Sequence, residues 1–174
     1  MASVQASVPD NKNFLSPIGF QFTIKRLPKV NYFCTAASIP DVSLRTIETW
    51  QTPFIQLPQP GDKLDFAPLT LTFRVDEDML NYQEIYNWMT GLGYPDNFDQ
   101  RRAYGKKVPS GEIFSDASLI ITTNQYKPNI EVKFTDIYPA SLTALEFNIT
   151  AEDVQYMEAQ VTFQYRKYDL NTAL

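Results

Sequence analysis

The chain has 174 residues, of which 44% are hydrophobic and 20% charged, and this ordinary globular composition argues against a disordered protein. A formal net charge of −5 argues against a protein that binds nucleic acid through a basic face. The absence of histidine removes the usual general base and the commonest metal ligand. The only cysteine, Cys34, rules out an intrachain disulfide. No apolar run approaches the roughly 20 residues of a membrane span, so we expect no membrane partner.

The chain begins with small and polar residues that predict a flexible N-terminal arm over residues 1–17. The arm could instead be ordered against a neighbouring subunit, and the sequence leaves both alternatives open. The remaining residues, 18–174, are predicted to form a single domain. Its first strand is predicted over 19–26, where apolar and polar residues alternate, and a second strand over 30–37 would complete a hairpin.

Residues 41–66 are predicted to form a long extended β-ribbon that protrudes from the domain. The residues from Leu44 onward alternate as a strand does, but Pro53, Pro58 and Pro60 argue against a place at the centre of a sheet. The apolar side chains of this segment either pack on the chain's own core or serve as anchors on a neighbouring subunit. The candidate contacts between subunits or rings are Arg45, Trp50, Phe54 and Ile55.

The strongest pattern in the chain lies between residues 69 and 92. A strand is predicted over 69–75, because apolar residues alternate there with threonine and arginine. A helix is predicted over 81–91, because apolar residues recur on one helical stripe, with Asn81 as N-cap and Glu84 completing a capping box. The predicted helix–sheet core consists of Leu71, Phe73, Ile85, Trp88 and Met89.

The helix is followed by a polar connection that holds the densest basic cluster of the chain. Arg101 and Arg102 belong to this cluster, and the acidic turn at residues 76–78 of another copy is one candidate partner for them. The simpler interpretation is a solvated loop. Further strands are predicted over 117–123, 129–137, 145–150 and 158–168, with a break at Tyr138 and Pro139.

The segment around the predicted helix also resembles a known family. Asp76, the pair Asn81-Tyr82 and the pair Trp88-Met89 follow a threonine-rich strand that ends in Phe73-Arg74. This arrangement resembles the tail-tube family of contractile bacteriophages, and it is most similar to the tube-initiator and cap subunits of the baseplate in T-even-like phages. The chain is shorter than those initiator subunits. Its length therefore favours a bulk tube subunit, whereas Asn81-Tyr82 favours an initiator, and both remain open.

The alternation pattern and the resemblance together predict a mainly β tail-tube fold. We expect two packed antiparallel sheets, either a β-sandwich or a partly open barrel, with one flanking α-helix and the long β-ribbon. The resemblance implies homohexameric rings that stack into a conduit for genome passage, with tail sheath and baseplate proteins as partners. It also implies that phage DNA passes through the lumen without specific binding, and that the protein is assembled in the host cytoplasm and resides in the virion.

The sequence holds no recognisable catalytic or cofactor-binding motif. Its six glycines are scattered, so no phosphate-binding loop is present, and one cysteine without histidine cannot supply a structural zinc site. We therefore expect no enzyme activity, no cofactor and no metal. Besides the tube subunit, two hypotheses are a non-enzymatic β-sandwich that recognises carbohydrate or protein on a virion, and a hydrolase that relies on paired carboxylates. Ring formation would distinguish the tube subunit from the first of these.

Overall fold

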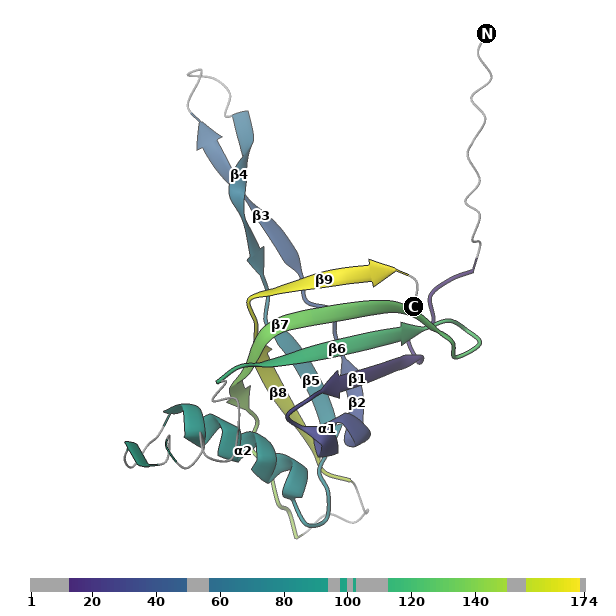
Figure 1. Cartoon of the computed structure of the whole chain (residues 1–174), viewed down its shortest axis with the longest axis vertical. Helices are drawn as coiled ribbons and strands as arrows, with labels where there is room; N and C mark the ends of the chain where they lie inside the picture. Colours follow the sequence, from purple (N-terminus) through teal and green to yellow (C-terminus); the bar gives the residue numbers. More distant parts are fainter. Residues whose placement is uncertain are drawn as a thin grey trace.

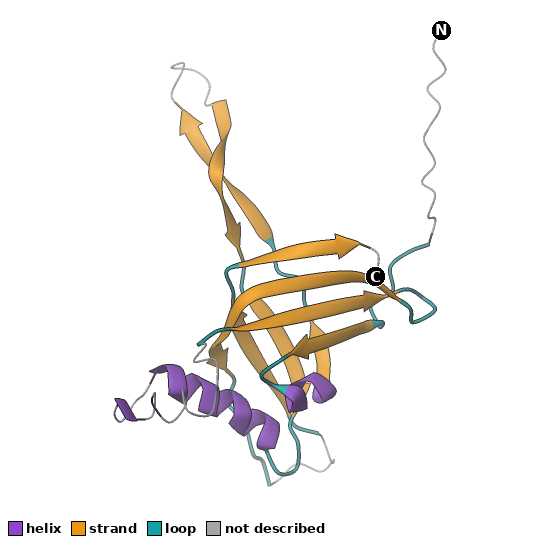
Figure 2. Cartoon of the chain, in the orientation of Figure 1, coloured by secondary structure: helices purple, strands orange, loops and turns teal. Residues whose placement is uncertain are grey.

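The structure is a computed structural model that describes residues 13–49, 57–93, 98–99, 102, 113–149 and 156–172. Strands dominate it, and two helices lie at the end of the sheets away from a projecting pair of strands (Figure 2). In chain order the elements are β1 (Phe20–Ile24), α1 (Pro28–Phe33), β2 (Cys34–Ala37), β3 (Val42–Thr49), β4 (Leu57–Phe66), β5 (Leu69–Arg74), α2 (Leu80–Gly93), β6 (Ser115–Thr122), β7 (Pro128–Leu142), β8 (Glu158–Gln164) and β9 (Lys167–Thr172).

Seven of the strands form two antiparallel sheets that share the long strand β7 (Figure 1). Sheet A has the order β1-β6-β7-β9, and it uses the N-terminal half of β7. Sheet B has the order β7-β8-β5-β2, and it uses the C-terminal half of β7. The remaining strands, β3 and β4, pair with each other as a separate ribbon. The predicted mainly β fold with two antiparallel sheets, a flanking helix and a long ribbon is confirmed.

Strand β7 passes from one sheet to the other through a β-bulge at Asp136. Two steps along β6, from Ser115 to Ala117, face three steps along β7, from Ile137 to Phe134, and Asp136 has a φ of 58°. The extra residue reverses which side chains point into the core, as a bulge does. The predicted break at residues 138–139 is therefore wrong. Pro139 is tolerated inside the strand because it lies at a second irregularity of the ladder with β8.

The hydrophobic core fills the space between the two sheets and the helices. Leu71 and Phe73 on β5, with Ile85 and Trp88 on α2, are at most 1% exposed, and Met89 is half-buried against them. The Trp88 ring lies 6.3 Å from that of Phe163 on β8. All five residues predicted for the helix–sheet core thus lie at or beside it.

The hairpin predicted over residues 19–37 is wrong, because helix α1 separates β1 from β2. Proline stands in the first turn of α1, where its missing N–H is no disadvantage, and Val30 is fully buried. The Asn31 side chain accepts a hydrogen bond from the Ile24 amide at 2.8 Å and donates one to the Ile24 carbonyl at 3.1 Å. These bonds turn the chain, so β1 pairs with β6 in sheet A and β2 pairs with β5 in sheet B.

Two predictions about the C-terminal part of the chain are also wrong. Residues 145–149 form no strand, although Phe147 and Ile149 alternate with polar residues, because both side chains are exposed and face no partner sheet. The strand predicted over 158–168 is divided into β8 and β9. The chain must leave sheet B and join sheet A at this point, and the Arg166 amide donates to the Thr135 carbonyl at 3.0 Å, opposite the bulge of β7.

Helix α2 starts one residue before the predicted start and ends two residues after the predicted end. Asn81 is buried within its first turn, where its Nδ2 donates to the Arg74 carbonyl at 2.8 Å. Its Oδ1 accepts from the amides of Asp76 and Tyr82. The predicted capping box is wrong, because Glu84 instead faces Lys29 of α1 at 3.7 Å.

Candidate assembly surfaces

The ribbon formed by β3 and β4 projects away from both sheets (Figure 1). Its basal half exposes Val42, Leu44 and Leu64, and Leu44 stands opposite Leu64 in the register. Arg45 lies on the same strand, exposed to solvent, and its Nε is 2.7 Å from Asp65 Oδ2. A two-stranded ribbon without a core is marginally stable by itself. The ribbon therefore exposes apolar side chains, and contact with another surface would stabilise it.

Three aromatic residues fix the base of the ribbon to the sheets. The Tyr165 hydroxyl donates to the Ala67 carbonyl at 2.7 Å, and the Tyr168 hydroxyl donates to the Pro40 carbonyl at 3.2 Å. The Phe66 ring packs edge-on against the Tyr168 ring at 5.5 Å. Burial, and secondarily the neighbouring Tyr168, raises the pKa of Tyr165 to about 12, so its hydroxyl remains a hydrogen-bond donor over the whole physiological range. The ribbon thus leaves the body from the end of sheet A where β9 begins.

Sheet A has two open edges, one along β1 and one along β9. Each of these strands has a partner on one side in the described structure: β6 for β1, and β7 for β9. Open strand edges present unpaired N–H and C=O groups to any strand that approaches. On β9, Leu170 lies in the same row as the buried Val132 of β7, yet it is 59% exposed because no strand lies beyond β9 to cover it. The β9 edge therefore carries an uncovered apolar side chain.

One face of sheet A packs on the core, and the opposite face, which we call the free face, is polar. Its strand residues carry four carboxylates, counting Asp136 at the bulge, and two ammonium groups, and Lys25 follows just beyond β1. Two of the acids have partners within the chain: Asp169 lies 2.8 Å from Lys167 Nζ, and Glu131 accepts a hydrogen bond from Ser118 at 2.8 Å. The charged residues within the strands are Asp116, Glu131, Lys133, Asp136, Lys167 and Asp169, and Asp136 lies 3.7 Å from the Arg166 guanidinium. The free face is therefore nearly neutral, although the whole chain carries −5.

Several predicted contact residues have no described position. Trp50, Phe54, Ile55 and Arg101 lie outside the described residues. Arg102 is exposed, and its guanidinium lies 3.4 Å from the Asp99 carboxylate, three residues earlier in the chain. The geometry brings Arg45 to the ribbon, and it does not bring Arg45 and Arg102 together.

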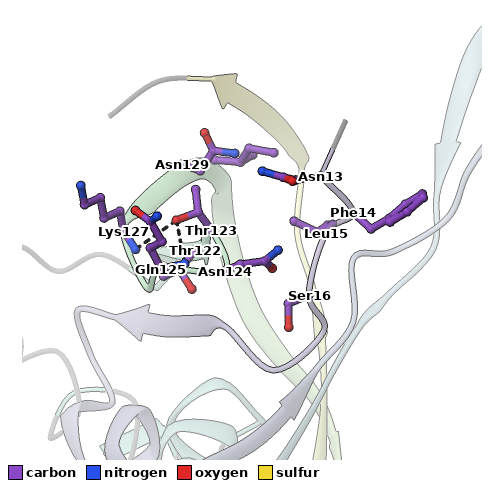
Figure 3. Close-up of a pocket in the computed structure, with 11 residues that line it drawn as sticks. Asn13, Phe14, Leu15, Ser16, Thr122, Thr123, Asn124, Gln125, Lys127 and Asn129 are labelled. Atoms are coloured by element: carbon purple, nitrogen blue, oxygen red, sulfur yellow. Dashed lines mark hydrogen bonds between the residues drawn. The ribbon is translucent and has the colours of Figure 1, made fainter. Parts of the chain in front are cut away.

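The N-terminal segment and the turn between β6 and β7 form an open pocket of about 530 Å³ (Figure 3). Amide and hydroxyl side chains line most of it, including Asn13, Ser16 and Asn124. Within the turn, Thr123 Oγ1 accepts hydrogen bonds from the amides of Gln125 and Lys127 at 3.4 and 3.3 Å. A second open pocket of about 260 Å³ lies between the same segment and Tyr126. The segment and the turn thus form one continuous surface at this end of sheet A.

Chemical groups for catalysis or metal binding do not gather in the described part of the chain. No three acidic or cysteine side chains there could hold a metal ion together. Cys34 is half-buried, and this burial raises the pKa of its thiol to about 11, so the reactive thiolate is scarce at neutral pH. No helix among the described residues is long and apolar enough to cross a membrane.

The model of one protein family, described as phage tail tube protein, matches residues 3–171 of this sequence. The chain belongs to the phage tail tube protein family. This family consists of structural tube proteins rather than enzymes, and the chain is a structural subunit of this tail-tube type. The predicted family, fold and non-enzymatic character are thereby confirmed. No curated protein sequence matches the chain.

Solved structures of low sequence identity share the fold. A chain of the anti-feeding prophage cap, the tube terminating cap, is 17% identical with a TM-score of 0.67, and the match covers 99% of this chain and 100% of that one. A chain of the PVC sheath–tube complex, from an extracellular contractile injection system in its extended state, is 16% identical with a TM-score of 0.59, covering 98% and 95%. Hcp1 from Flavobacterium johnsoniae is 16% identical with a TM-score of 0.51, covering 92% and 97%.

Sequence reasoning missed two of the candidate surfaces. The open edges of sheet A depend on pairing between distant strands, and no local pattern indicates which strand will stand at an edge. The exposed apolar residues of the N-terminal segment did have a signal, because Phe14, Leu15 and Ile18 interrupt a stretch that is otherwise small and polar.

Proposed function

We propose that this tube subunit assembles into homohexameric rings, which stack into a conduit inside a contractile tail. The observation that carries the proposal is the pair of open edges on sheet A, β1 on one side and β9 on the other. Repeating one heterologous contact around a closed rotation makes a ring. Joining every β9 edge to the β1 edge of the next copy leaves sheet A without an exposed edge.

The strand directions in sheet A fit this joint. The order β1-β6-β7-β9 is antiparallel at each step, so β1 and β9 run in opposite directions. A rotation about the ring axis preserves the direction of each strand along that axis. The β1 strand of the next copy would therefore pair with β9 in the antiparallel sense, and the alternation would continue around a closed barrel. An odd number of strands in this sheet would instead force a parallel joint.

The side chains at the two edges also fit the joint. Leu170 lies on the core side of β9 and is 59% exposed in the single chain. Phe20 lies on the core side of β1 and is only partly buried. Pairing of the edges would cover both side chains and continue the apolar layer from one copy into the next, which removes apolar area from water.

In such a ring the free face of sheet A would line the lumen. Sheet B and the helices cover the other face, and the bulkier layer has more room on the outer circumference of a ring. The lumen wall would then be nearly neutral, with Lys167 paired to Asp169 and with carboxylates beside each lysine. A wall of this kind gives a polyanion few uncompensated cations to bind, which supports passage of phage DNA without specific binding.

The ribbon would connect one ring to the next, with sheath and baseplate proteins as outer partners in the virion and assembly in the host cytoplasm. Both the bulk tube subunit and the baseplate initiator fit this description. Trp50 and Phe54 lie in the segment between β3 and β4, and changing both should spare the fold while weakening the stacking of rings. Unchanged stacking of that double variant would argue against a bridging ribbon.

Negative-stain electron microscopy of the purified chain over a range of concentrations tests the proposal. Six-fold rings with an open centre are expected. Spontaneous long tubes would identify a bulk subunit, whereas rings that extend only on a template would identify an initiator. Monomers at every concentration would contradict self-assembly, and would favour the alternative of a binding module for carbohydrate or protein on a virion.

A further inference from the structure

We propose that the apolar rim formed by Phe14, Leu15, Ile18 and Tyr126 is the surface on which the basal half of the ribbon from a copy in the adjacent ring packs. The occupant is a second copy of this chain, through Val42, Leu44 and Leu64 of its ribbon. This inference rests on the proposed stacking of rings, and it names the receiving surface.

The rim is apolar and uncovered in the single chain. Phe14 is 92% exposed, Ile18 is 78% exposed and Tyr126 is 74% exposed. Phe14, Leu15 and Ile18 lie within five consecutive residues, and all three are outside the core cluster. The segment is held to the sheet at its end, where the Thr122 amide donates to the Gly19 carbonyl at 3.0 Å. Such a concentration of exposed apolar side chains on a fixed support is typical of an interaction surface.

Tyr126 adds an independent observation, because its backbone is in the left-handed region with a φ of 59°. This conformation disfavours a bulky residue and suits glycine or asparagine. The Tyr126 amide donates to the Thr123 carbonyl at 2.8 Å, which closes the turn. An unfavourable residue therefore stands at the tip of the turn, with its ring directed to solvent instead of into the core. A role for that ring outside the single chain explains its presence.

The ribbon base and the rim lie at opposite ends of sheet A (Figure 1). The ribbon is fixed beside the first residues of β9 through Tyr168, whereas the rim lies at the turn between β6 and β7, near the last residues of β9. Rings stacked in one orientation bring opposite ends of their subunits together. This is a heterologous contact that does not close, and such contacts build open filaments.

The two surfaces also match in chemistry. The basal half of the ribbon exposes three aliphatic side chains, Val42, Leu44 and Leu64, to meet the apolar rim. The charged side chains of that half are three carboxylates and two cations, whereas Lys127 is the charged residue of the turn.

The substitution Tyr126→Asn separates an interface role from a structural one. Asparagine accepts the left-handed backbone more readily than tyrosine does, so the variant should unfold at the same temperature as the wild type or higher. If the tyrosine ring packs on the next ring, stacking should nevertheless require at least a tenfold higher protein concentration, measured by light scattering and microscopy. The matched control is Tyr32→Asn, because Tyr32 is 84% exposed on α1, away from the rim. The control should stack as the wild type does.

A cysteine pair tests the contact directly. In a Cys34→Ser background, Ile18→Cys and Leu64→Cys together should give chain ladders on mild oxidation of stacked rings, whereas either substitution alone should give at most dimers. Normal stacking of Tyr126→Asn, or the absence of ladders, would overturn the inference while leaving the ring intact. Wild-type rings that do not associate at any concentration would overturn it as well. A chain that forms no rings would contradict the proposed function itself.

Discussion

Replacing Trp88 by alanine should lower the free energy of unfolding by about 3–5 kcal/mol. The side chain is 1% exposed, and it packs against Phe163 of sheet B at a ring distance of 6.3 Å. The Arg26 guanidinium lies 5.0 Å from the centre of the Trp88 ring, and Trp88 Nε1 donates a hydrogen bond to the Ile113 carbonyl at 3.2 Å. Alanine would leave a cavity between helix and sheet, with a further loss of about 1 kcal/mol from the hydrogen bond.

The assay is urea unfolding of the full chain, monitored by far-ultraviolet circular dichroism because this signal comes from the backbone and does not depend on the tryptophan that is replaced. Trp88→Phe keeps most of the ring and loses the N–H donor, so it should cost only about 1–2 kcal/mol. Tyr86→Ala removes an exposed aromatic residue two positions earlier on the same helix, and it should stay within about 0.5 kcal/mol of the wild type. A loss below about 1 kcal/mol for Trp88→Ala would refute the reasoning that α2 anchors the core.

Three further predictions concern single side chains. Asn81→Ala should lower the free energy of unfolding by about 2–4 kcal/mol, because the buried backbone groups that are hydrogen-bonded to Asn81 would lose their partners. A loss as small as that for an exposed residue, in thermal or chemical unfolding, would contradict this. Asp136→Gly should be neutral or stabilise by up to about 1 kcal/mol, whereas Asp136→Val should destabilise, because a φ of 58° suits glycine and opposes a β-branched residue; the opposite order in melting temperature would exclude strain at the bulge. Alkylation of Cys34 by iodoacetamide should accelerate about tenfold per pH unit between pH 8 and 10, because its pKa is raised from 9.0 to about 11. An alkylation rate that levels off near pH 9 would be inconsistent with a buried thiol. Because the folded protein holds the pKa of the thiol above its unfolded value of 9.0, the contribution of the neutral thiol to stability is complete below pH 9 and is lost as the pH rises through 11.

The strands that are easiest to predict are those with one buried face and no irregularity. In β5 the apolar side chains alternate strictly with polar ones and form a buried row, and in the largely apolar β6 every second residue from Ala117 to Ile121 is buried. Helix α2 was equally predictable, because Ile85 and Trp88 lie on one stripe and both are buried. Local periodicity reports these elements because each one packs on the core in a single orientation along its whole length.

The elements that were mispredicted are those that change orientation or partner along their length. In β7 the bulge at Asp136 shifts the alternation of buried residues by one position, so the sequence pattern looks like the end of a strand although the strand continues. Between β8 and β9 the apolar alternation continues through Tyr165, because the Tyr165 ring packs against Phe134 of sheet A. The sequence pattern therefore gives no sign that the chain changes sheets at this point. Helix α1 has six residues, which is too short for a 3.6-residue period to be recognised. The assembly surfaces depend on which strands are left at the edges, and that is a property of the whole topology.

The sharing of β7 between both sheets has a mechanical consequence. Its first half is hydrogen-bonded to β6 and β9, and its second half to β8, without interruption of the chain. Neither layer can separate from its neighbours without breaking bonds on the strand that also holds the other layer. Amide hydrogen exchange should therefore report one cooperative opening for both sheets, with the ribbon exchanging faster. A pull along a tube built from this subunit would be borne by both layers together, so the wall would resist shear between its inner and outer surfaces.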